Sequence, residues 1–160
     1  MEARRVKSEW ERAGVYYVRT EAMVLGFDLT LAGEFRDDTT DGHYILVLDD
    51  RQKPVSANRL HLMPEKGYAK IERVATVSTA RHLGAGRLGI EAAEQWAREL
   101  GYHKVVITSR EEAVGFYQKQ GYRVREDMDP DTLEPKTAQD YSVREDRDPR
   151  FICVYMEKSW

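Results

Sequence analysis

The chain has 160 residues, enough for one domain with a sizeable core. Its 25 basic and 28 acidic residues give a formal net charge of −3, which excludes a whole-molecule field that recruits nucleic acid or an anionic membrane. A single cysteine excludes an intrachain disulfide, the four histidines lack zinc-site spacing, and the sequence has no long apolar run or signal-peptide core, so we expect a cytoplasmic protein.

The N-terminal third predicts a short strand followed by two helices. Trp10, Ala13 and Tyr17 recur at helical spacing behind Ser8, a suitable N-cap, although residues 15–18 also have strand propensity. We favour the helix. The expected elements are a strand within 1–7, a helix from Ser8 to about 23, a helix at 29–35 and a loop at 37–42.

A hairpin and a long central strand are predicted next. The hairpin strands are 44–48 and 55–62, joined by the turn-forming segment 49–54. In the strand at 69–77 the alternation of apolar residues slips at Glu72 and Arg73, which indicates a β-bulge, a feature that re-aims side chains beside active sites.

The central strand leads into a glycine-rich turn and a helix. Ile90, Ala93, Ala97 and Leu100 recur at helical spacing, and Gly101 stops the helix. The turn at 81–86 reads Arg-His-Leu-Gly-Ala-Gly, and its glycines let the backbone N–H groups of the first helical turn approach a phosphate. Residues 84–89 also match GxGxxG, a weak signal for a dinucleotide-binding oxidoreductase.

A second strand and helix follow. Residues 103–108 read as a buried strand, Ser109 and Glu112 form a predicted capping box, and a short helix with Phe116 and Tyr117 runs to Gly121. The segment 126–149 reads as a long loop before a strand at 151–156. It begins with five acidic residues that predict attraction of cationic amines: Glu126, Asp127, Asp129, Asp131 and Glu134.

Two motifs in this order resemble the GNAT superfamily of acetyl-CoA-dependent N-acetyltransferases. The first is R-x-x-G-x-G at 81–86, and the second is A-x-x-F-Y-x-K-x-G-Y at 113–122. The resemblance covers about residues 44–124, and the layout is similar to small bacterial ElaA-like members. It implies an α/β GNAT-like acyl-CoA N-acyltransferase fold, a mixed, mostly antiparallel sheet flanked by helices, in one domain spanning 1–160.

The resemblance also implies how acetyl-CoA, the co-substrate, is held. The turn binds the pyrophosphate, and the backbone of the preceding strand pairs with pantetheine as an added strand does. Arg110 stands where many members carry asparagine and is expected to contact CoA differently or to face its 3′-phosphate side. The complete expected set is Ala75, Thr76, Val77, Arg81, His82, Leu83, Gly84, Ala85, Gly86 and Arg110.

For catalysis, the resemblance assigns Tyr117 as the acid that protonates the leaving thiolate. Glu72, at the strand irregularity, is our leading base, directly or through water. Glu34, His43 and His61 are weaker candidates, and Cys153 is read as a buried small hydrophobe. The resemblance places the first helical region beside the acceptor, with some of these side chains near it: Tyr16, Tyr17, Arg19 and Glu21.

The expected activity is direct transfer of an acetyl group to a primary amine of a small molecule. The partners are that amine and, as one option, a second copy of the chain in a homodimer; no metal is expected. Three alternatives stay open: acetylation of a protein or peptide amine, a non-catalytic acyl-CoA sensor, and an NAD(P)-dependent oxidoreductase.

Overall fold

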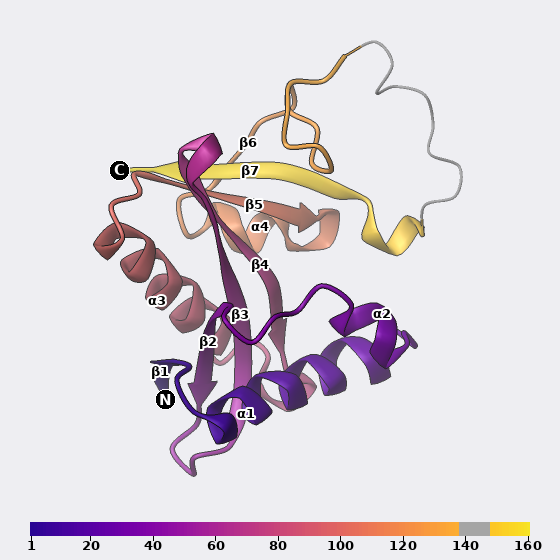
Figure 1. Cartoon of the computed structure of the whole chain (residues 1–160). Coiled ribbons are helices and arrows are strands. Elements are labelled where there is room, and N and C mark those ends of the chain that lie inside the picture. The colour runs from indigo at the N-terminus through magenta and orange to yellow at the C-terminus, as the bar shows by residue number, and fades with distance from the viewer. Residues whose placement is uncertain (138–147) are drawn as a thin grey trace. The chain divides into compact units, whose positions relative to one another are not determined.

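The computed structural model describes residues 1–137 and 148–160, which form two compact units (Figure 1). Unit 1 is Met1–Tyr102 and unit 2 is His103–Trp160. Of the loop expected at 126–149, residues 138–147 lie outside the described part of the chain.

Unit 1 is built on an antiparallel meander of consecutive strands. The strands are β1 (Glu2–Arg5), β2 (His43–Leu48), β3 (Pro54–Met63) and β4 (Tyr68–Thr76). Five of the six residues of β2 are buried, as expected for a strand covered on both faces. The predicted hairpin turn is confirmed: Asp49 Oδ1 accepts the backbone N–H groups of Arg51 at 2.8 Å and Lys53 at 2.9 Å.

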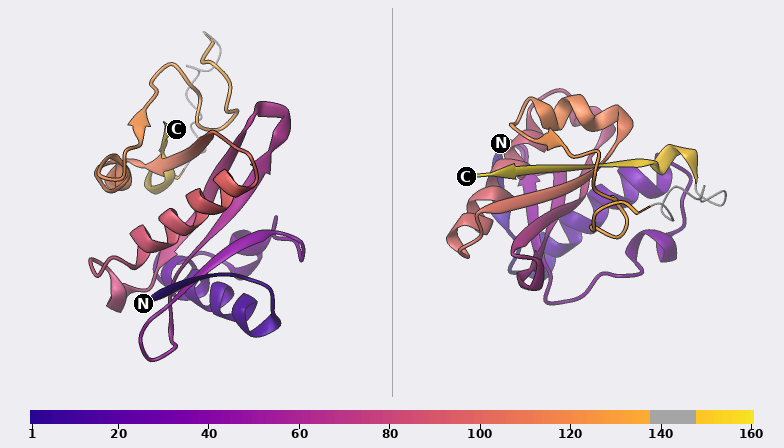
Figure 2. Two further views of the ribbon diagram at one scale, coloured as in Figure 1. Left: turned by 90° about the vertical axis from the view of Figure 1, so that its left-hand side faces the viewer. Right: turned by 90° about the horizontal axis from the view of Figure 1, so that it is seen from above.

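Helices α1 (Glu9–Arg19) and α3 (Ala85–Glu99) cover opposite faces of this sheet (Figure 2). Gly14 of α1 lies against Leu46, and Gly89 of α3 lies against Val47. Successive residues of a strand point to opposite faces, so the two helices sandwich β2. A Cβ at Gly89 would lie 3.3 Å from Val47 Cγ2, so the last glycine of GxGxxG has a packing role here.

Helix α1 begins at the predicted N-cap but turns a different face inward. Ser8 Oγ accepts the N–H of Glu11, and the Glu11 carboxylate accepts the N–H of Ser8 at 2.9 Å, which completes a capping box. Trp10, Ala13 and Tyr17, the residues used to predict the helix, are exposed. The buried residues Glu11 and Arg19 are charged, so hydrophobic periodicity alone did not find the inner face, which consists of Glu11, Val15, Val18, Arg19 and Ala22.

A π-helical segment, η1 (Thr20–Leu25), continues α1. Thr20 Oγ1 donates to the Tyr16 carbonyl at 2.7 Å within this wider turn. Helix α2 (Leu31–Phe35) follows, capped by Thr30, whose Oγ1 accepts the Gly33 N–H at 3.0 Å. A 3-10 turn, η2 (Pro64–Lys66), joins β3 to β4 and ends at Gly67.

The predicted β-bulge is confirmed in β4. Arg59 pairs with Glu72 and Ala57 with Ala75, so one residue of β3 faces two of β4. Arg73, within the bulge, has a positive φ of 52°. This left-handed conformation is unfavourable for a residue with a Cβ and re-aims the side chains on either side of it.

Unit 2 contains three antiparallel strands, β5 (Lys104–Arg110), β7 (Cys153–Ser159) and β6 (Arg123–Val124), with β7 in the middle. The 3-10 turn η4 (Glu111–Ala113) and helix α4 (Val114–Gln118) follow β5, and η5 (Pro149–Phe151) precedes β7.

The predicted capping box at Ser109 and Glu112 is wrong. Ser109 is a strand residue whose Oγ donates to the Arg110 carbonyl at 2.7 Å, and α4 starts after Ala113 without a side-chain cap. The strand extends two residues further than its apolar run, because Ser109 and Arg110 pair with β7 through their backbones.

No helix in the described chain is both long and apolar enough to cross a membrane.

Candidate active site

The glycine-rich turn has the geometry that an anion site requires. Gly84 adopts φ 87° and precedes the first residue of α3, where it acts as N-cap without a side-chain hydrogen bond. The Gly84 carbonyl accepts the N–H of Leu88, so the N–H groups of the preceding first-turn residues have no intrahelical acceptor. His82 also has a positive φ, of 65°, and residues 81–84 are exposed while Ala85 is buried. The sequence thus places a helix N-terminus behind an open, polar turn.

The end of β4 offers only part of its backbone for pairing with a ligand. The Val77 N–H donates to the Val55 carbonyl at 2.9 Å, and the Ala75 carbonyl accepts the Ser56 hydroxyl at 2.8 Å. Because peptide groups alternate in direction along a strand, those of Thr76 point away from β3. Of the three residues predicted to pair with pantetheine, Thr76 therefore carries the outward backbone groups.

The start of the turn is attached to η1. In the 3-10 turn η3 (Ser78–Ala80), Ser78 donates its hydroxyl to Glu21 at 2.9 Å and its N–H to the same carboxylate at 3.3 Å. Glu21 thereby accepts two donors at the point where the strand leaves the sheet. It lines a cavity of about 510 Å³ together with Tyr17, Val77 and Thr79.

Glu72 contacts two cationic side chains and a histidine. Its Oε1 lies 2.9 Å from Arg59 Nη2 and 3.2 Å from His61 Nδ1, and its Oε2 lies 3.4 Å from Lys70 Nζ. Only 16% of the Glu72 side chain is exposed. Burial opposes the charge of Arg59, but the neighbouring Glu72 and hydrogen bonds with Asp37 and Tyr44 give this arginine a raised pKa.

These residues belong to a larger charged cluster, made up of Arg19, Glu34, Asp37, Asp38, Arg59, Glu72 and Arg73. Arg19, 1% exposed, pairs with Glu34 at 3.0 Å and with Asp38 at 2.6 Å. Burial alone would raise the pKa of Asp38, but the hydrogen bond from Arg19 and a second from Tyr44 lower it. The cluster joins α2 and the residues after it to the strands beside the bulge.

Tyr117 of α4 is buried in unit 2, with 6% of its surface exposed. Burial is the main cause that raises the pKa of its phenol, with a smaller electrostatic contribution from Cys153, so the hydroxyl keeps its proton at neutral pH. Its ring packs edge-on against Phe116 and Tyr122.

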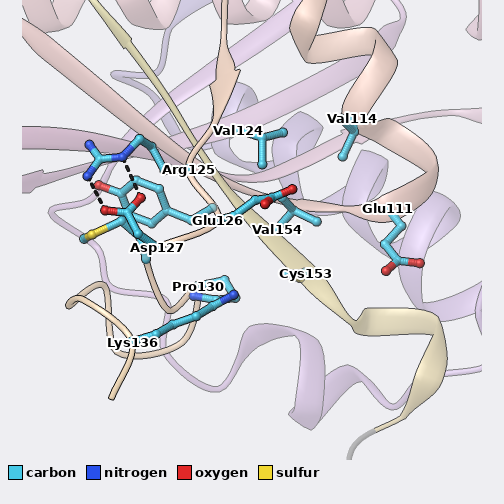
Figure 3. A pocket seen from close by; sticks show the side chains of 12 residues that line it. Glu111, Val114, Val124, Arg125, Glu126, Asp127, Pro130, Lys136, Cys153 and Val154 are labelled. Atoms are coloured by element: carbon cyan, nitrogen blue, oxygen red, sulfur yellow. Dashed lines mark hydrogen bonds and ion pairs between the residues drawn. The ribbon is translucent and has the colours of Figure 1, made fainter. Parts of the chain in front are cut away.

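A cavity of about 720 Å³ opens beside Cys153 (Figure 3). Arg125 and Asp127 at its rim form a two-point ion pair, with contacts of 2.8 and 2.7 Å. Within the described chain, the side chains of Glu111, Glu126 and Lys136 line the cavity without a hydrogen-bond or ion-pair partner. The remaining lining residues are Val114, Val124, Met128, Pro130, Val154 and Tyr155.

The sequence matches the Acetyltransferase (GNAT) family over residues 7–122. The chain belongs to this family. It is 32% identical over 124 residues to the uncharacterized N-acetyltransferase YjcF of Bacillus subtilis (strain 168), an alignment that covers 78% of this chain and 86% of YjcF. This GNAT protein is therefore an acetyltransferase by family, which sets aside the oxidoreductase alternative based on GxGxxG.

Solved structures share the fold. A Lactobacillus plantarum protein provisionally classed as an N-acetyltransferase superposes with a TM-score of 0.76 at 25% identity, covering 99% of both chains. Tetrahymena GCN5 gives 0.70 at 12% identity, with 99% and 96% covered. A Mycobacterium tuberculosis protein crystallised with CoA gives 0.67 at 16% identity, with 100% and 99% covered. These likenesses confirm the predicted GNAT fold class, and the family assignment makes acyl-CoA the co-substrate.

Two sequence-based expectations need correction. Cys153 is half-buried, not buried, and its thiol donates to the Phe151 carbonyl at 3.3 Å while lining the cavity. Arg19 faces its carboxylate partners rather than an open pocket.

Two of the five acidic residues at the start of the loop make internal contacts. Asp127 pairs with Arg125, and Asp129 is buried, where it accepts the Asp131 N–H at 2.8 Å and shapes the turn. Of the five acidic residues, Glu126 faces the cavity without a partner in the described chain. Glu111, which the sequence analysis did not single out, lines the same cavity. Its position directly after a strand is the signal that could have identified it, because functional residues often lie where strands end in loops.

Arg110, the predicted CoA contact, lies at the end of β5 and is attached to η5. Its Nε donates to the Arg150 carbonyl at 2.9 Å, and its guanidinium lies 5.7 Å from the centre of the Phe151 ring. Within the described residues, no group of three or more His, Cys, Asp or Glu side chains is arranged to hold a metal ion.

Proposed function

We propose that the protein, as one GNAT domain spanning residues 1–160, transfers an acetyl group from acetyl-CoA directly to a primary amine of a small molecule. Family membership supports acetyl transfer, and the open turn before α3 is the structural observation that carries the cofactor assignment. Gly84 leaves the first-turn N–H groups accessible, and the helix dipole adds a favourable field for an anion.

Cofactor binding in this proposal uses the residues predicted from the sequence. The pyrophosphate lies against the turn from Arg81 to Gly86, with His82, Leu83 and Ala85 forming its backbone surface. Pantetheine runs along Ala75–Val77, using the outward peptide groups of Thr76. Arg110 replaces the asparagine that many members carry at this position, and we assign it to the 3′-phosphate side of CoA.

Tyr117 is the proposed acid. Its buried phenol is protonated at neutral pH and can give its proton to the thiolate that leaves acetyl-CoA. Glu72 is assigned to the proton-accepting side, where an acceptor ammonium, with an ordinary pKa of about 10, must lose a proton before attack.

The cavity at Cys153 is the proposed place of the acceptor. Its volume of about 720 Å³ lies within the range of about 300–1,000 Å³ that is usual for small-molecule sites, which favours a small amine over a peptide segment. The unpaired carboxylates of Glu111 and Glu126 favour a cationic amine. The ammonium group of Lys136 can pair with an acidic group on the same molecule.

A two-step assay tests this function. Because a ligand that binds only the native state raises its stability, acetyl-CoA and CoA should raise the melting temperature, and NAD(P) should not. A panel of cationic, neutral and anionic amines is then screened by thiol release from acetyl-CoA. Stabilisation by CoA without thiol release from any amine supports the sensor alternative, and stabilisation by NAD(P) alone contradicts the cofactor assignment.

Activity confined to peptide amines contradicts the small-molecule proposal. For active small amines, Glu126→Gln should raise the KM of a cationic amine and leave the KM of acetyl-CoA unchanged, with Glu65→Gln, an exposed residue of unit 1, as the control. Equal effects of both variants remove the cavity assignment.

A further inference from the structure

The contacts made by Glu72 disfavour its carboxylate as the group that takes the proton of the acceptor ammonium. Arg59 contacts Oε1 through both Nε, at 3.0 Å, and Nη2, at 2.9 Å, and Lys70 lies near Oε2. With His61 Nδ1 also 3.2 Å from Oε1, the contacts of this oxygen occupy the directions from which a further proton would approach it. A side chain held by this carboxylate is better placed to act as the base.

His61 is such a side chain. It lies on β3 two residues after Arg59, so both side chains project from the same face of the sheet. In the register with β4, His61 pairs with Lys70 and Arg59 pairs with Glu72. Its Nδ1 is 3.2 Å from Glu72 Oε1, and 54% of its side chain is exposed. Its other ring nitrogen, Nε2, has no partner within the described chain.

This arrangement has the parts of a carboxylate-oriented base. A carboxylate at Nδ1 fixes which ring nitrogen carries the hydrogen and stabilises the imidazolium that forms when Nε2 accepts a proton. Imidazole is also the side chain that ordinarily changes charge between pH 5 and 8. The charged groups that face it are Glu72 and Lys70 from β4 and Arg59 from its own strand.

The pair also flanks the bulge. Glu72 directly precedes Arg73, whose positive φ marks the bulge, and the strand segment proposed to hold pantetheine starts at Ala75. The base is thus next to the end of the cofactor segment, where the thioester arm is expected.

We infer that His61 is the general base of this acetyltransferase and that Glu72 is its positioning residue. The inference rests on the proposed function. Nε2 of His61 takes one proton from the acceptor ammonium, directly or through water, and the neutral amine attacks the thioester carbonyl carbon. A C–N bond forms, the C–S bond breaks with its electron pair on sulfur, and the sulfur takes a proton from the general acid. The new amide nitrogen loses a proton that restores this acid, and His61 returns its own proton to solvent.

The test compares His61→Gln and Glu72→Gln with His103→Gln, a change at an exposed histidine of unit 2, using an amine found active in the panel. At pH 7, His61→Gln should lower kcat by about 10²-fold with an unchanged affinity for acetyl-CoA, and Glu72→Gln should lower it less. The loss should shrink as the pH approaches the pKa of the acceptor ammonium, because a larger share of the amine in solution is then already neutral. The kcat of the parent protein should fall at acidic pH, and this fall should be absent from His61→Gln.

Other results overturn the inference. A parent-like kcat for His61→Gln means that the base is elsewhere, and a loss of equal size at every pH means that His61 has a structural role. Absence of thiol release by the parent protein is a failure of the proposed function instead. Acetyl-CoA binding, measured by calorimetry for each variant, separates a lost base from a lost fold.

Discussion

Burial determines what Tyr117 can do. A phenol in a low-dielectric site resists ionisation, so it is a donor and not a nucleophile at neutral pH. The protonated phenol is the form that the proposed acid requires, although the sequence motif, not the burial, pointed to this residue. Burial of a tyrosine in a short helix is invisible to periodicity, because five residues are too few to define a face.

Replacement of Tyr117 by phenylalanine should lower kcat by about 10²-fold while the affinity for acetyl-CoA stays the same. Phenylalanine keeps the packing against Phe116 and Tyr122 and removes only the proton donor. Steady-state kinetics and calorimetry measure the two quantities. Tyr68→Phe, at another buried tyrosine, is the control for loss of a hydroxyl in the core. Parent-like turnover would show that water or another group protonates the thiolate.

At the level of helices and strands, the sequence predicted most elements but missed details that depend on ion pairs. The turn-forming segment 49–54 helped to locate β2 and β3, apolar alternation located β4, and its slip at Glu72 located the bulge. Hydrophobic spacing did not identify the buried face of α1, because the buried Glu11 is held by Arg4 and by the capping box. The His61–Glu72 contact was equally hidden, since strand register decides which residues of β3 and β4 face each other.

Two glycines with nearly the same backbone conformation separate a binding role from a folding role. Gly84 has φ 87° and Gly67 has φ 76°, and a Cβ at either position would meet no atom within 4 Å. Valine should therefore strain both positions by about 1–2 kcal/mol, but only Gly84→Val should also obstruct the phosphate turn. Acetyl-CoA affinity, measured by calorimetry, should fall more for Gly84→Val than for Gly67→Val. Equal affinities in folded variants would contradict the turn assignment.

Gly42, a loop glycine, is unsuitable as the control in that comparison. A Cβ there would lie 2.7 Å from the Tyr44 ring, and the Tyr44 hydroxyl donates to Asp38 of the charged cluster. The composition of the loop gave no sign of this contact.

For the molecule as a whole, acid should be the main destabilising condition, and Glu11 shows why. Burial alone would raise its pKa, but hydrogen bonds from Arg4, Ser8 and the backbone of Lys7 lower it from 4.5 to about 2. A carboxyl group with a depressed folded-state pKa stabilises the fold above its unfolded pKa, and this contribution is lost as the pH falls from 4.5 toward about 2.

Glu11→Gln should therefore lower the free energy of unfolding by about 1–2 kcal/mol at pH 7, and this difference should shrink below pH 4.5. Chemical denaturation at a series of pH values measures it, with Glu65→Gln as the exposed control. A difference that persists unchanged to pH 2 would mean that the capping geometry, and not the charge, carries the effect.

The family and fold could be predicted because two short motifs carry them, whereas the acceptor could not. Its proposed cavity is lined by residues from a strand end, a loop and β7, which only the fold brings together. The same holds for the charged cluster beside the bulge, whose members lie far apart in the sequence.

The attachment of Glu21 to Ser78 has a consequence for motion in unit 1. Since the Ser78 amide is held by a carboxylate of η1, its hydrogen exchanges with solvent only when that contact opens. The segment that leads into the glycine-rich turn therefore opens only when Ser78 separates from Glu21 of η1. Exchange at this amide would report how often the segment before the turn separates from the helix, and a bound cofactor would slow it.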